Sequence, residues 1–181
     1  MIIVCDIDGV LNDLMVKTLS IYNLENNKNI QMSDLNRYNF HDCLPEEDAN
    51  GIINLFQRKD VWEYLSPMPD TQWGLKVLID DGHEVYLATA THHENFAWKV
   101  DWVAKHYPFI DIHNIICIHN KGLLKCDVMI DDCIDNLKRN TCQRILINHP
   151  WNQDEVQEYN IHRVYNFVDV IDIIKSMERN D

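Results

Sequence analysis

The sequence predicts an α/β fold, namely a Rossmann-like three-layer sandwich built on a parallel sheet, with a small helical subdomain inserted after the first strand. Short runs rich in Ile and Val alternate with longer amphipathic stretches, which is the pattern of βαβ units. The first two apolar runs are separated by far more residues than a single crossover helix needs, and this surplus predicts the inserted subdomain. The predicted strands lie at 2–5, 84–88, 114–118, 128–130 and 144–147.

The long segment after the first strand is expected to fold separately from the sheet. It is polar at 23–37, and Leu44-Pro45-Glu46-Glu47 is typical of a helix start. The chain returns through Ser66-Pro67-Met68-Pro69, whose two prolines stiffen the backbone. We therefore assign 1–13 and 70–181 to the core and 14–69 to the inserted subdomain, with hinges near 11–14 and 66–70.

The helices predicted between and after the later strands carry ordinary boundary signals. The first, at 70–81, ends at Gly82, a residue that favours helix termini. The second, at 94–106, ends ahead of Pro108, which cannot continue a helix. Near the C-terminus, apolar residues recur on one face of a helix over 167–174. These helices supply the outer layers of the predicted sandwich.

The composition is that of an ordinary globular chain with an acidic balance. Of 181 residues, 46% are hydrophobic and 25% are charged, and 16 Lys+Arg against 29 Asp+Glu give a net charge of −13. This balance opposes binding to nucleic acid or to an anionic membrane, since both require basic patches. The apolar N-terminal run is too short for a signal peptide or membrane span, so we expect a cytoplasmic protein. The cysteines include no C-x-x-C pair, which favours free thiols over a zinc site or disulfide framework.

Two acidic residues follow the first strand directly. Asp6 and Asp8 flank Ile7, and Gly9 allows a sharp turn where both carboxylates leave the sheet. In open α/β sheets, ligands bind beyond the carboxyl ends of the strands. The pair is therefore either part of a ligand site that uses a countercharge such as Mg²⁺, or simply two solvated acids at a turn.

Three later elements end in residues of the kind that bind phosphate or metal. Thr89 closes the second predicted strand, Lys121 follows the third, and Asp131 and Asp132 follow the fourth. Taken one at a time, Thr89 is explained by a local backbone hydrogen bond and Lys121 by solvation. The adjacent carboxylates of Asp131 and Asp132 suit the hard oxygen coordination of Mg²⁺. The same two residues would also be explained by a strand that simply ends in charged side chains.

In this order the elements resemble a known set of motifs. An Asp-x-Asp-Gly-Val sequence, a strand with a terminal Thr, a Lys, and a strand followed by Asp-Asp resemble the four motifs of the haloacid dehalogenase (HAD) superfamily of phosphohydrolases. The insertion at 14–69 matches the position of that superfamily's first cap class. Within the superfamily the chain most resembles the 5'(3')-deoxyribonucleotidases. This narrower similarity rests on Asp6-Ile7-Asp8-Gly9-Val10-Leu11, Leu65-Ser66-Pro67-Met68-Pro69, Gly82-His83-Glu84-Val85, the spacing of Lys121 to Asp131, and Asn148-His149-Pro150-Trp151-Asn152.

The resemblance implies a fold, an activity and a set of roles. It implies an HAD-like core with a helical cap, and a Mg²⁺-dependent phosphomonoesterase that dephosphorylates (deoxy)ribonucleoside monophosphates through an aspartyl-phosphate. Asp6 would be the nucleophile, and Asp8 the general acid and base. Mg²⁺ would be bound by Asp6, by Asp8 through its backbone carbonyl, and by an acid of the fourth motif. For that acid, Asp132 is the first choice and Asp131 the alternative. The phosphate ligands would be Thr89, Ala90 and Lys121.

The second motif departs from the pattern of the family that it resembles. The family commonly has Ser and then Pro after the Thr, whereas this sequence continues with Ala90, Thr91 and His92. Ala90 offers only its backbone N–H to a phosphate, and Thr91 is a candidate substitute for the missing hydroxyl. The departure therefore concerns the details of phosphate binding.

Specificity is expected to come from the inserted subdomain, which would close over the site. Aromatic faces stack on bases, although rings also form the core of small helical subdomains. The rings in question are Tyr38, Phe40, Phe56, Trp62 and Tyr64. His92 and His93 are candidates for the rim of the site, whereas His149 and Trp151 suit either a phosphate rim or a structural loop.

Three functional hypotheses follow. The first is the nucleotidase, the second keeps its chemistry but uses a sugar phosphate or another small phosphomonoester, and the third is a non-catalytic phosphate-binding or phosphoacceptor module. A receiver-type acceptor domain is shorter and carries its phosphorylated Asp on a middle strand, whereas the strand at 84–88 is followed by Thr89. Asp8 is a second acid that a phosphatase needs and an acceptor does not, which favours an enzyme. We expect a small nucleoside monophosphate as partner, no nucleic acid or membrane partner, and a homodimer as one option.

Overall fold

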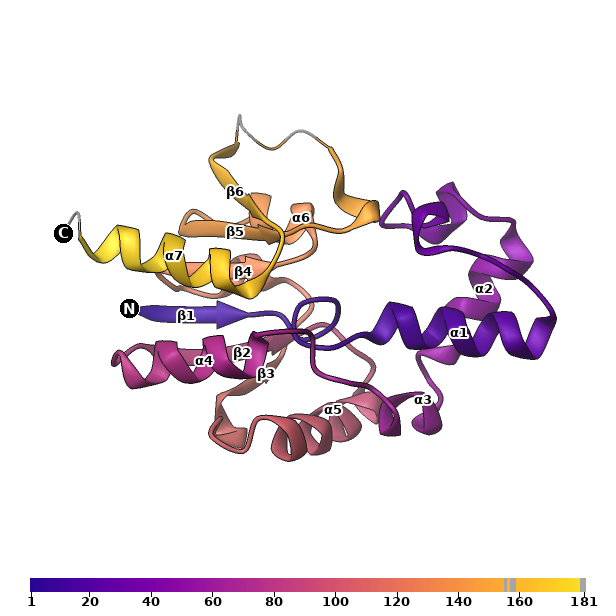
Figure 1. The fold of residues 1–181 in the computed structure, drawn as a ribbon, viewed down its shortest axis with the longest axis horizontal. Helices are drawn as coiled ribbons and strands as arrows, with labels where there is room; N and C mark the ends of the chain where they lie inside the picture. Colours follow the sequence, from indigo (N-terminus) through magenta and orange to yellow (C-terminus); the bar gives the residue numbers. More distant parts are fainter. Residues whose placement is uncertain (155, 157–158, 180–181) are drawn as a thin grey trace.

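The computed structural model describes residues 1–154, 156 and 159–179 (Figure 1). Within that part the strands form a six-stranded sheet in the order β3-β2-β1-β4-β5-β6, with parallel pairing throughout. The strands are β1 (Ile2–Cys5), β2 (Glu84–Thr89), β3 (Ile115–Cys117), β4 (Val128–Asp131), β5 (Gln143–Ile147) and β6 (Ile161–Val164). The predicted α/β fold with a parallel sheet is confirmed, and the five predicted strands correspond to β1 to β5.

The strand β6 was not predicted from the sequence. Its residues Ile161 and Val164 are buried, whereas His162 is exposed and Arg163 is half-buried. The strand lies at one edge of the described sheet and pairs with β5. Because polar residues occupy its middle, β6 lacks the continuous apolar run by which buried parallel strands are recognised.

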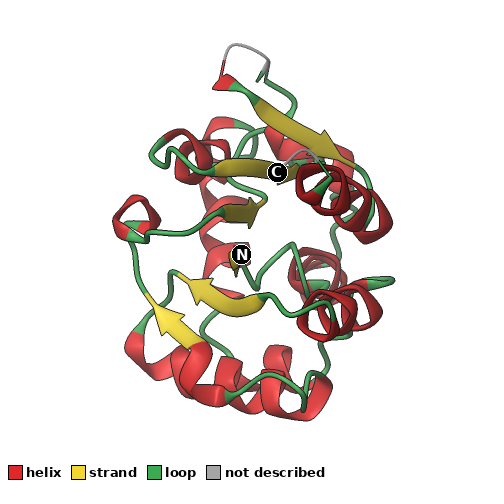
Figure 2. Cartoon of the chain, turned by 90° about the vertical axis from the view of Figure 1, so that its left-hand side faces the viewer, coloured by secondary structure: helices red, strands yellow, loops and turns green. Residues whose placement is uncertain are grey.

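Helices cover both faces of the sheet, as Figure 2 shows. Ile3 and Cys5 of β1 belong to a core cluster that also contains residues of α4, α5 and α7, whereas Val4 belongs to a smaller cluster with α6. This division arises because successive side chains of a strand point to opposite faces. The helices are α4 (Thr71–Asp80), α5 (His93–His106), α6 (Ile134–Lys138) and α7 (Phe167–Glu178). The three helices predicted for the core are confirmed as α4, α5 and α7. Among the described residues, no helix combines the length and the apolar character that crossing a bilayer requires.

Gly74 allows α4 and α7 to pack closely. A Cβ atom built on Gly74 would lie 2.3 Å from Cδ1 of Phe167, well inside van der Waals contact. We expect Gly74→Val to lower the free energy of unfolding by about 1–3 kcal/mol, because overpacking forces the ring or the helices to shift. Denaturant unfolding measures this change. The control is Lys76→Ala, which removes only an exposed ion pair with Asp80 that is worth about 0.5 kcal/mol or less. Equal losses in the two variants would contradict the close packing.

The segment between β1 and α4 lies beyond the carboxyl ends of the strands (Figure 1). Its helices are α1 (Leu14–Asn26), α2 (Glu46–Leu55) and α3 (Lys59–Glu63). The two connections to the core run side by side. The N–H of Asp13 donates to the carbonyl of Ser66 at 3.1 Å, and the N–H of Met68 donates to the carbonyl of Leu11 at 2.8 Å. The segment therefore enters and leaves the core at one hydrogen-bonded place.

The order of the strands reverses at β1. From β1 the chain adds β2 and β3 on one side of the sheet, and it then returns to add β4, β5 and β6 on the other side. The connections that leave β1 and β4 diverge at such a point and leave a crevice beyond the carboxyl ends of the strands. Open α/β sheets bind their ligands in this crevice, so the loops after β1 and β4 are where a site is expected.

Candidate active site

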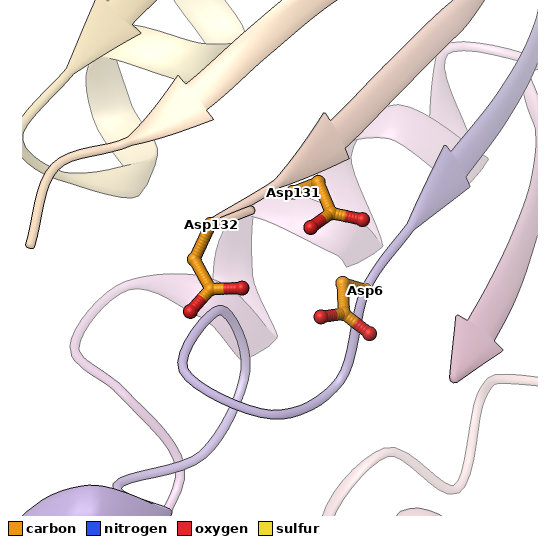
Figure 3. A group of neighbouring side chains, drawn as sticks. All are labelled: Asp6, Asp131 and Asp132. Atoms are coloured by element: carbon orange, nitrogen blue, oxygen red, sulfur yellow. The ribbon is translucent and has the colours of Figure 1, made fainter. Parts of the chain in front are cut away.

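Three carboxylates meet at the crevice between β1 and β4 (Figure 3). Asp6 follows β1, Asp131 is the last residue of β4, and Asp132 comes next. One oxygen of each carboxylate lies within 4.8 Å of the others, and all three residues are buried. They meet because β1 and β4 are neighbours, with the N–H of Asp6 donating to the carbonyl of Ile130 at 2.9 Å. The structure thus brings together acids from the first and fourth motifs.

Lys121 lies among these carboxylates and is itself buried. Its Nζ is 2.7 Å from Oδ1 of Asp6 and 2.8 Å from Oδ2 of Asp131. Burial lowers the pKa of Lys121, but the two carboxylates raise it by more, so the ammonium group stays protonated. Oδ1 of Asp131 accepts from the N–H of Cys133 at 2.8 Å, and Asn136 donates to the same carboxylate. Asp131 therefore holds Lys121 and the turn after β4.

Asp132 has a different environment. Its Oδ2 accepts from the indole N–H of Trp151 at 2.9 Å, and within the described chain it forms no ion pair. Burial raises the pKa of Asp132 well above its usual range, and Asp6 and Asp131 raise it further. Burial also raises the pKa of Asp6 to about 7, although Lys121 opposes this shift. A divalent cation stabilises buried carboxylates of this kind, so the oxygen donors fit Mg²⁺.

The turn after Asp8 requires a glycine. Gly9 has a φ of 72°, and a Cβ atom at this position would lie 2.8 Å from Oδ2 of Asp132. Nε2 of His149 donates to the carbonyl of Gly9 at 2.6 Å, and the His149 ring stacks on Trp151 with centroids 4.2 Å apart. Of the two roles that the sequence left open for His149, this contact supports the structural one, whereas Trp151 lines the cleft beside the carboxylates.

Asp8 is held on both of its carboxylate oxygens. Nδ2 of Asn12 donates to Oδ1 at 3.0 Å, and Nζ of Lys99 donates to Oδ2. The same Nζ lies 2.6 Å from the hydroxyl oxygen of Thr89, the last residue of β2. Lys99 belongs to α5, and its side chain is only 2% exposed. A buried cation thus joins the first and second motifs.

Lys99 was not predicted from the sequence, although a signal for it exists. The buried residues of α5 are Asn95, Lys99, Trp102 and Val103. Their spacing of three and four residues defines one face of a helix. A lysine on such an inward face is rarely buried unless it is paired. Position 99 within the predicted helix therefore indicates a buried acidic partner, but it does not indicate which one.

A cleft of about 370 Å³ opens above these groups. Asp6, Asp8, Asp132, Thr89, Lys99 and Lys121 all contribute to its lining. Other predicted phosphate-binding or substrate-pocket residues that line it are Tyr38, Phe40, Phe56, Trp62, Ala90, Thr91 and His92. Phe40 and Phe56 form an edge-to-face pair with ring centroids 6.3 Å apart. By contrast, Tyr64 is 69% exposed and is not part of the described lining.

Solved structures share this architecture. A predicted phosphatase from Clostridium acetobutylicum matches with a TM-score of 0.66 at 17% identity, covering 96% of this chain and 97% of that chain. A haloacid dehalogenase-like hydrolase from Streptococcus pneumoniae matches with a TM-score of 0.66 at 13% identity, covering 95% of this chain and 97% of that chain. The fold is therefore that of the haloacid dehalogenase-like hydrolases, as the four motifs predict.

Sequence comparison narrows the class to one family. The family described as "5' nucleotidase, deoxy (Pyrimidine), cytosolic type C protein" matches residues 1–179, and the chain belongs to this family. A 5'(3')-deoxyribonucleotidase of Clostridium acetobutylicum is 28% identical over 150 residues, which is 83% of each chain. A 5'(3')-deoxyribonucleotidase of Bacillus subtilis is 29% identical over 156 residues, covering 85% of this chain and 88% of the relative. Membership makes this chain a phosphoric monoester hydrolase, which supports the enzyme hypothesis over the non-catalytic module.

Proposed function

We propose that the chain is a Mg²⁺-dependent phosphomonoesterase that releases phosphate from (deoxy)ribonucleoside monophosphates through an aspartyl-phosphate on Asp6. The observation that carries this proposal is the contact of Asp6 with Lys121 at 2.7 Å, at the base of a cleft with aromatic walls. A carboxylate beside a buried cation can approach an anionic phosphate, because the cation offsets the repulsion. The names of the family and of its relatives support a nucleotide as the substrate.

Asp6 acts as the nucleophile. An oxygen of its carboxylate attacks the phosphorus while the bond from phosphorus to the leaving oxygen breaks in line with it. Lys121 neutralises the charge on the phosphoryl oxygens, and the hydroxyl of Thr89 and the N–H of Ala90 donate hydrogen bonds to them. Thr91 lines the same cleft and supplies a further hydroxyl at its edge.

Asp8 transfers the protons. It follows Asp6 by two residues and lines the same cleft. It gives a proton to the leaving alkoxide in the first step, and in the second it takes a proton from the water that attacks the aspartyl-phosphate. A carboxylate has about four lone-pair sites, so Asp8 retains free acceptor positions after bonding to Asn12 and Lys99.

Asp6, Asp132 and the backbone carbonyl of Asp8 would hold the metal ion. Asp132 suits this role better than Asp131, because Asp131 is occupied by Lys121 and by a backbone N–H, whereas Asp132 lines the cleft. When bound, Mg²⁺ would neutralise part of the charge that develops on the phosphate oxygens.

Residues 14–69 act as a cap over this site. The segment lies over the strand ends (Figure 1). Its residues Tyr38, Phe40 and Phe56 line the cleft, and we call these three rings the aromatic wall. Stacking of a base on an aromatic ring contributes about 1–3 kcal/mol, so this wall favours a nucleoside over a bare sugar. Movement about 11–14 and 66–70 would close the cap and exclude water from phosphoryl transfer. A cytoplasmic location fits a nucleotide substrate and belongs to the same proposal.

Phosphate release from a substrate panel tests the proposal. The panel contains ribonucleoside and deoxyribonucleoside monophosphates, phosphorylated at the 5' or 3' position, and sugar phosphates, each with Mg²⁺ or EDTA. We expect release to require Mg²⁺, with kcat/KM for deoxyribonucleotides at least about tenfold above that for sugar phosphates, because of base stacking. A preference for sugar phosphates would support the phosphomonoesterase activity and exclude a nucleoside monophosphate as the preferred substrate. Release that EDTA leaves unchanged would contradict the metal requirement.

A further inference from the structure

Lys99 is a buried lysine that joins three separate parts of the site. Its Nζ donates to Oδ2 of Asp8, lies 2.6 Å from Oγ1 of Thr89, and is 5.1 Å from the ring centroid of Trp62. These partners come from the loop after β1, from the end of β2 and from α3. The mechanism described above gives Lys99 no role, although burying an ammonium group is costly unless it is well paired.

The chemistry of an ammonium group sets the direction of these hydrogen bonds. Lysine has three donors and no acceptor, so the hydroxyl oxygen of Thr89 accepts from Lys99. The hydroxyl hydrogen of Thr89 is then free to point into the cleft that Thr89 lines, where a phosphate oxygen would accept it. Asp8 is fixed at the same time, by Lys99 on Oδ2 and by Asn12 on Oδ1.

Helix α5 also anchors the part of the cap that lies nearest to Lys99. Nδ2 of Asn95 donates to the carbonyl of Phe56 at 3.0 Å, and Nε1 of Trp102 donates to the carbonyl of Leu65 at 3.1 Å. Asn95, Lys99 and Trp102 lie on one face of α5, because residues three and four apart are neighbours on a helix. The face of α5 that holds the catalytic carboxylate therefore also holds the segment at 56–65.

Trp62 lies within this anchored segment and faces Lys99. It is 4% exposed, and its Nε1 donates to the carbonyl of Phe56 at 2.8 Å. Such a buried ring offers little surface to a base, in contrast to the half-buried Phe40. Its face is instead directed to a cation, which is a favourable contact worth about 0.5–2 kcal/mol.

We propose that Lys99 is a positioning residue, which holds Asp8 and Thr89 in the orientation that phosphoryl transfer uses. Trp62 acts through Lys99, by fixing the ammonium group, and is not a stacking platform for the base. The inference rests on the proposed function, because it assigns a role inside that site.

Lys99→Met tests the first part, because Met has a similar length and no donor. We expect kcat/KM for an alkyl phosphate to fall about 100-fold, which is typical when a catalytic group is displaced by about 1 Å. For p-nitrophenyl phosphate we expect a loss of about tenfold or less, because the leaving oxygen needs no proton from Asp8. The comparison uses kcat/KM, which reports the steps up to release of the alcohol. Lys105→Met, which changes an exposed lysine of the same helix, should match the wild type.

A double-variant cycle separates positioning from general destabilisation. Asp8→Asn removes the carboxylate that Lys99 holds, and it leaves no buried charge unpaired when Lys99→Met is added. In the Asp8→Asn background, Lys99→Met should lower kcat/KM for the same alkyl phosphate by about tenfold or less, because residues that act together are not additive. A full 100-fold loss in that background would show that Lys99 does not act through Asp8, and would overturn the proposal.

Trp62→Leu and Phe40→Ala distinguish the two uses of an aromatic ring. The substrates are a deoxyribonucleoside 5'-monophosphate and deoxyribose 5-phosphate, which lacks the base. Trp62→Leu should lower kcat/KM for both substrates by the same factor, whereas Phe40→Ala should lower it about tenfold for the nucleotide alone. A loss confined to the nucleotide in Trp62→Leu would reject the second part of the proposal.

Failure of the proposed function gives a different result from failure of this inference. No Asp6-dependent phosphate release from any substrate would reject the function itself. Asp6-dependent release together with a Lys99→Met enzyme that matches the wild type on the alkyl phosphate would reject only the role of Lys99.

Discussion

Asp6→Asn is expected to lower kcat by at least about 10⁴-fold, because an amide cannot take the place of the carboxylate nucleophile. The direct measurement is acid quenching with radiolabelled substrate, in which the wild type retains covalent phosphate and the variant does not. The matched control is Asp172→Asn, an exposed carboxylate on α7, which should retain wild-type turnover. Covalent labelling of Asp6→Asn at the wild-type level would contradict Asp6 as the nucleophile.

The same variant has an expected effect on stability. The pKa of Asp6 is raised by burial to about 7 in the folded protein, against about 3.9 in an unfolded chain. A raised carboxyl pKa means that ionisation disfavours the folded state, so the titration of Asp6 lowers the stability of the metal-free wild type as the pH rises from about 4 to about 7. Asp6→Asn removes this contribution and should make the slope of stability against pH more positive over this range, as measured by thermal unfolding in EDTA. An unchanged slope would show that Asp6 does not carry the raised pKa.

Asp132→Asn is expected to raise the Mg²⁺ concentration for half-maximal activity by at least about 100-fold. Removing a residue that only hydrogen-bonds to a metal ligand already lowers metal affinity or activity by about 10–100-fold, and removing a ligand should cost at least as much. Binding has a readout besides activity, since a ligand that binds the folded state raises the free energy of unfolding by about 2.7 kcal/mol at 100 times its Kd. Mg²⁺ should therefore raise the Tm of the wild type and leave that of Asp132→Asn nearly unchanged.

Asp131→Asn provides the contrast to that variant. Asp131 binds Lys121 at 2.8 Å and accepts from the N–H of Cys133, so its loss leaves a buried lysine with one carboxylate fewer. We expect Asp131→Asn to lower the Tm without metal, whereas Asp132→Asn should raise it or leave it unchanged, because burial and neighbouring charges disfavour the Asp132 carboxylate. An equal rise in Tm with Mg²⁺ for Asp132→Asn and the wild type would exclude Asp132 as a ligand.

The prediction of the sheet succeeded where the signal is local. The runs at 2–5 and 128–130 are continuous and apolar because β1, from Ile3 onward, and β4 are buried on both faces, and the polar residues after them mark the carboxyl edge of the sheet. The edge strand β6 has no such run, so it was missed. His149 was ambiguous for a related reason, since its partner Gly9 lies 140 residues away in the sequence.

The sequence by itself determined the parallel α/β core, the place of the inserted segment and the polar residues at the ends of the first four strands. It could do so because apolar periodicity, and the identity of the residues after each strand, can be recognised within short stretches of sequence. Only the tertiary structure decided that Asp131 contacts Lys121 whereas Asp132 accepts from Trp151, and that Lys99 pairs with Asp8 across 91 residues. These contacts depend on which strands become neighbours and which face of α5 turns inward. Packing of the whole chain sets both, and no short stretch of sequence encodes either.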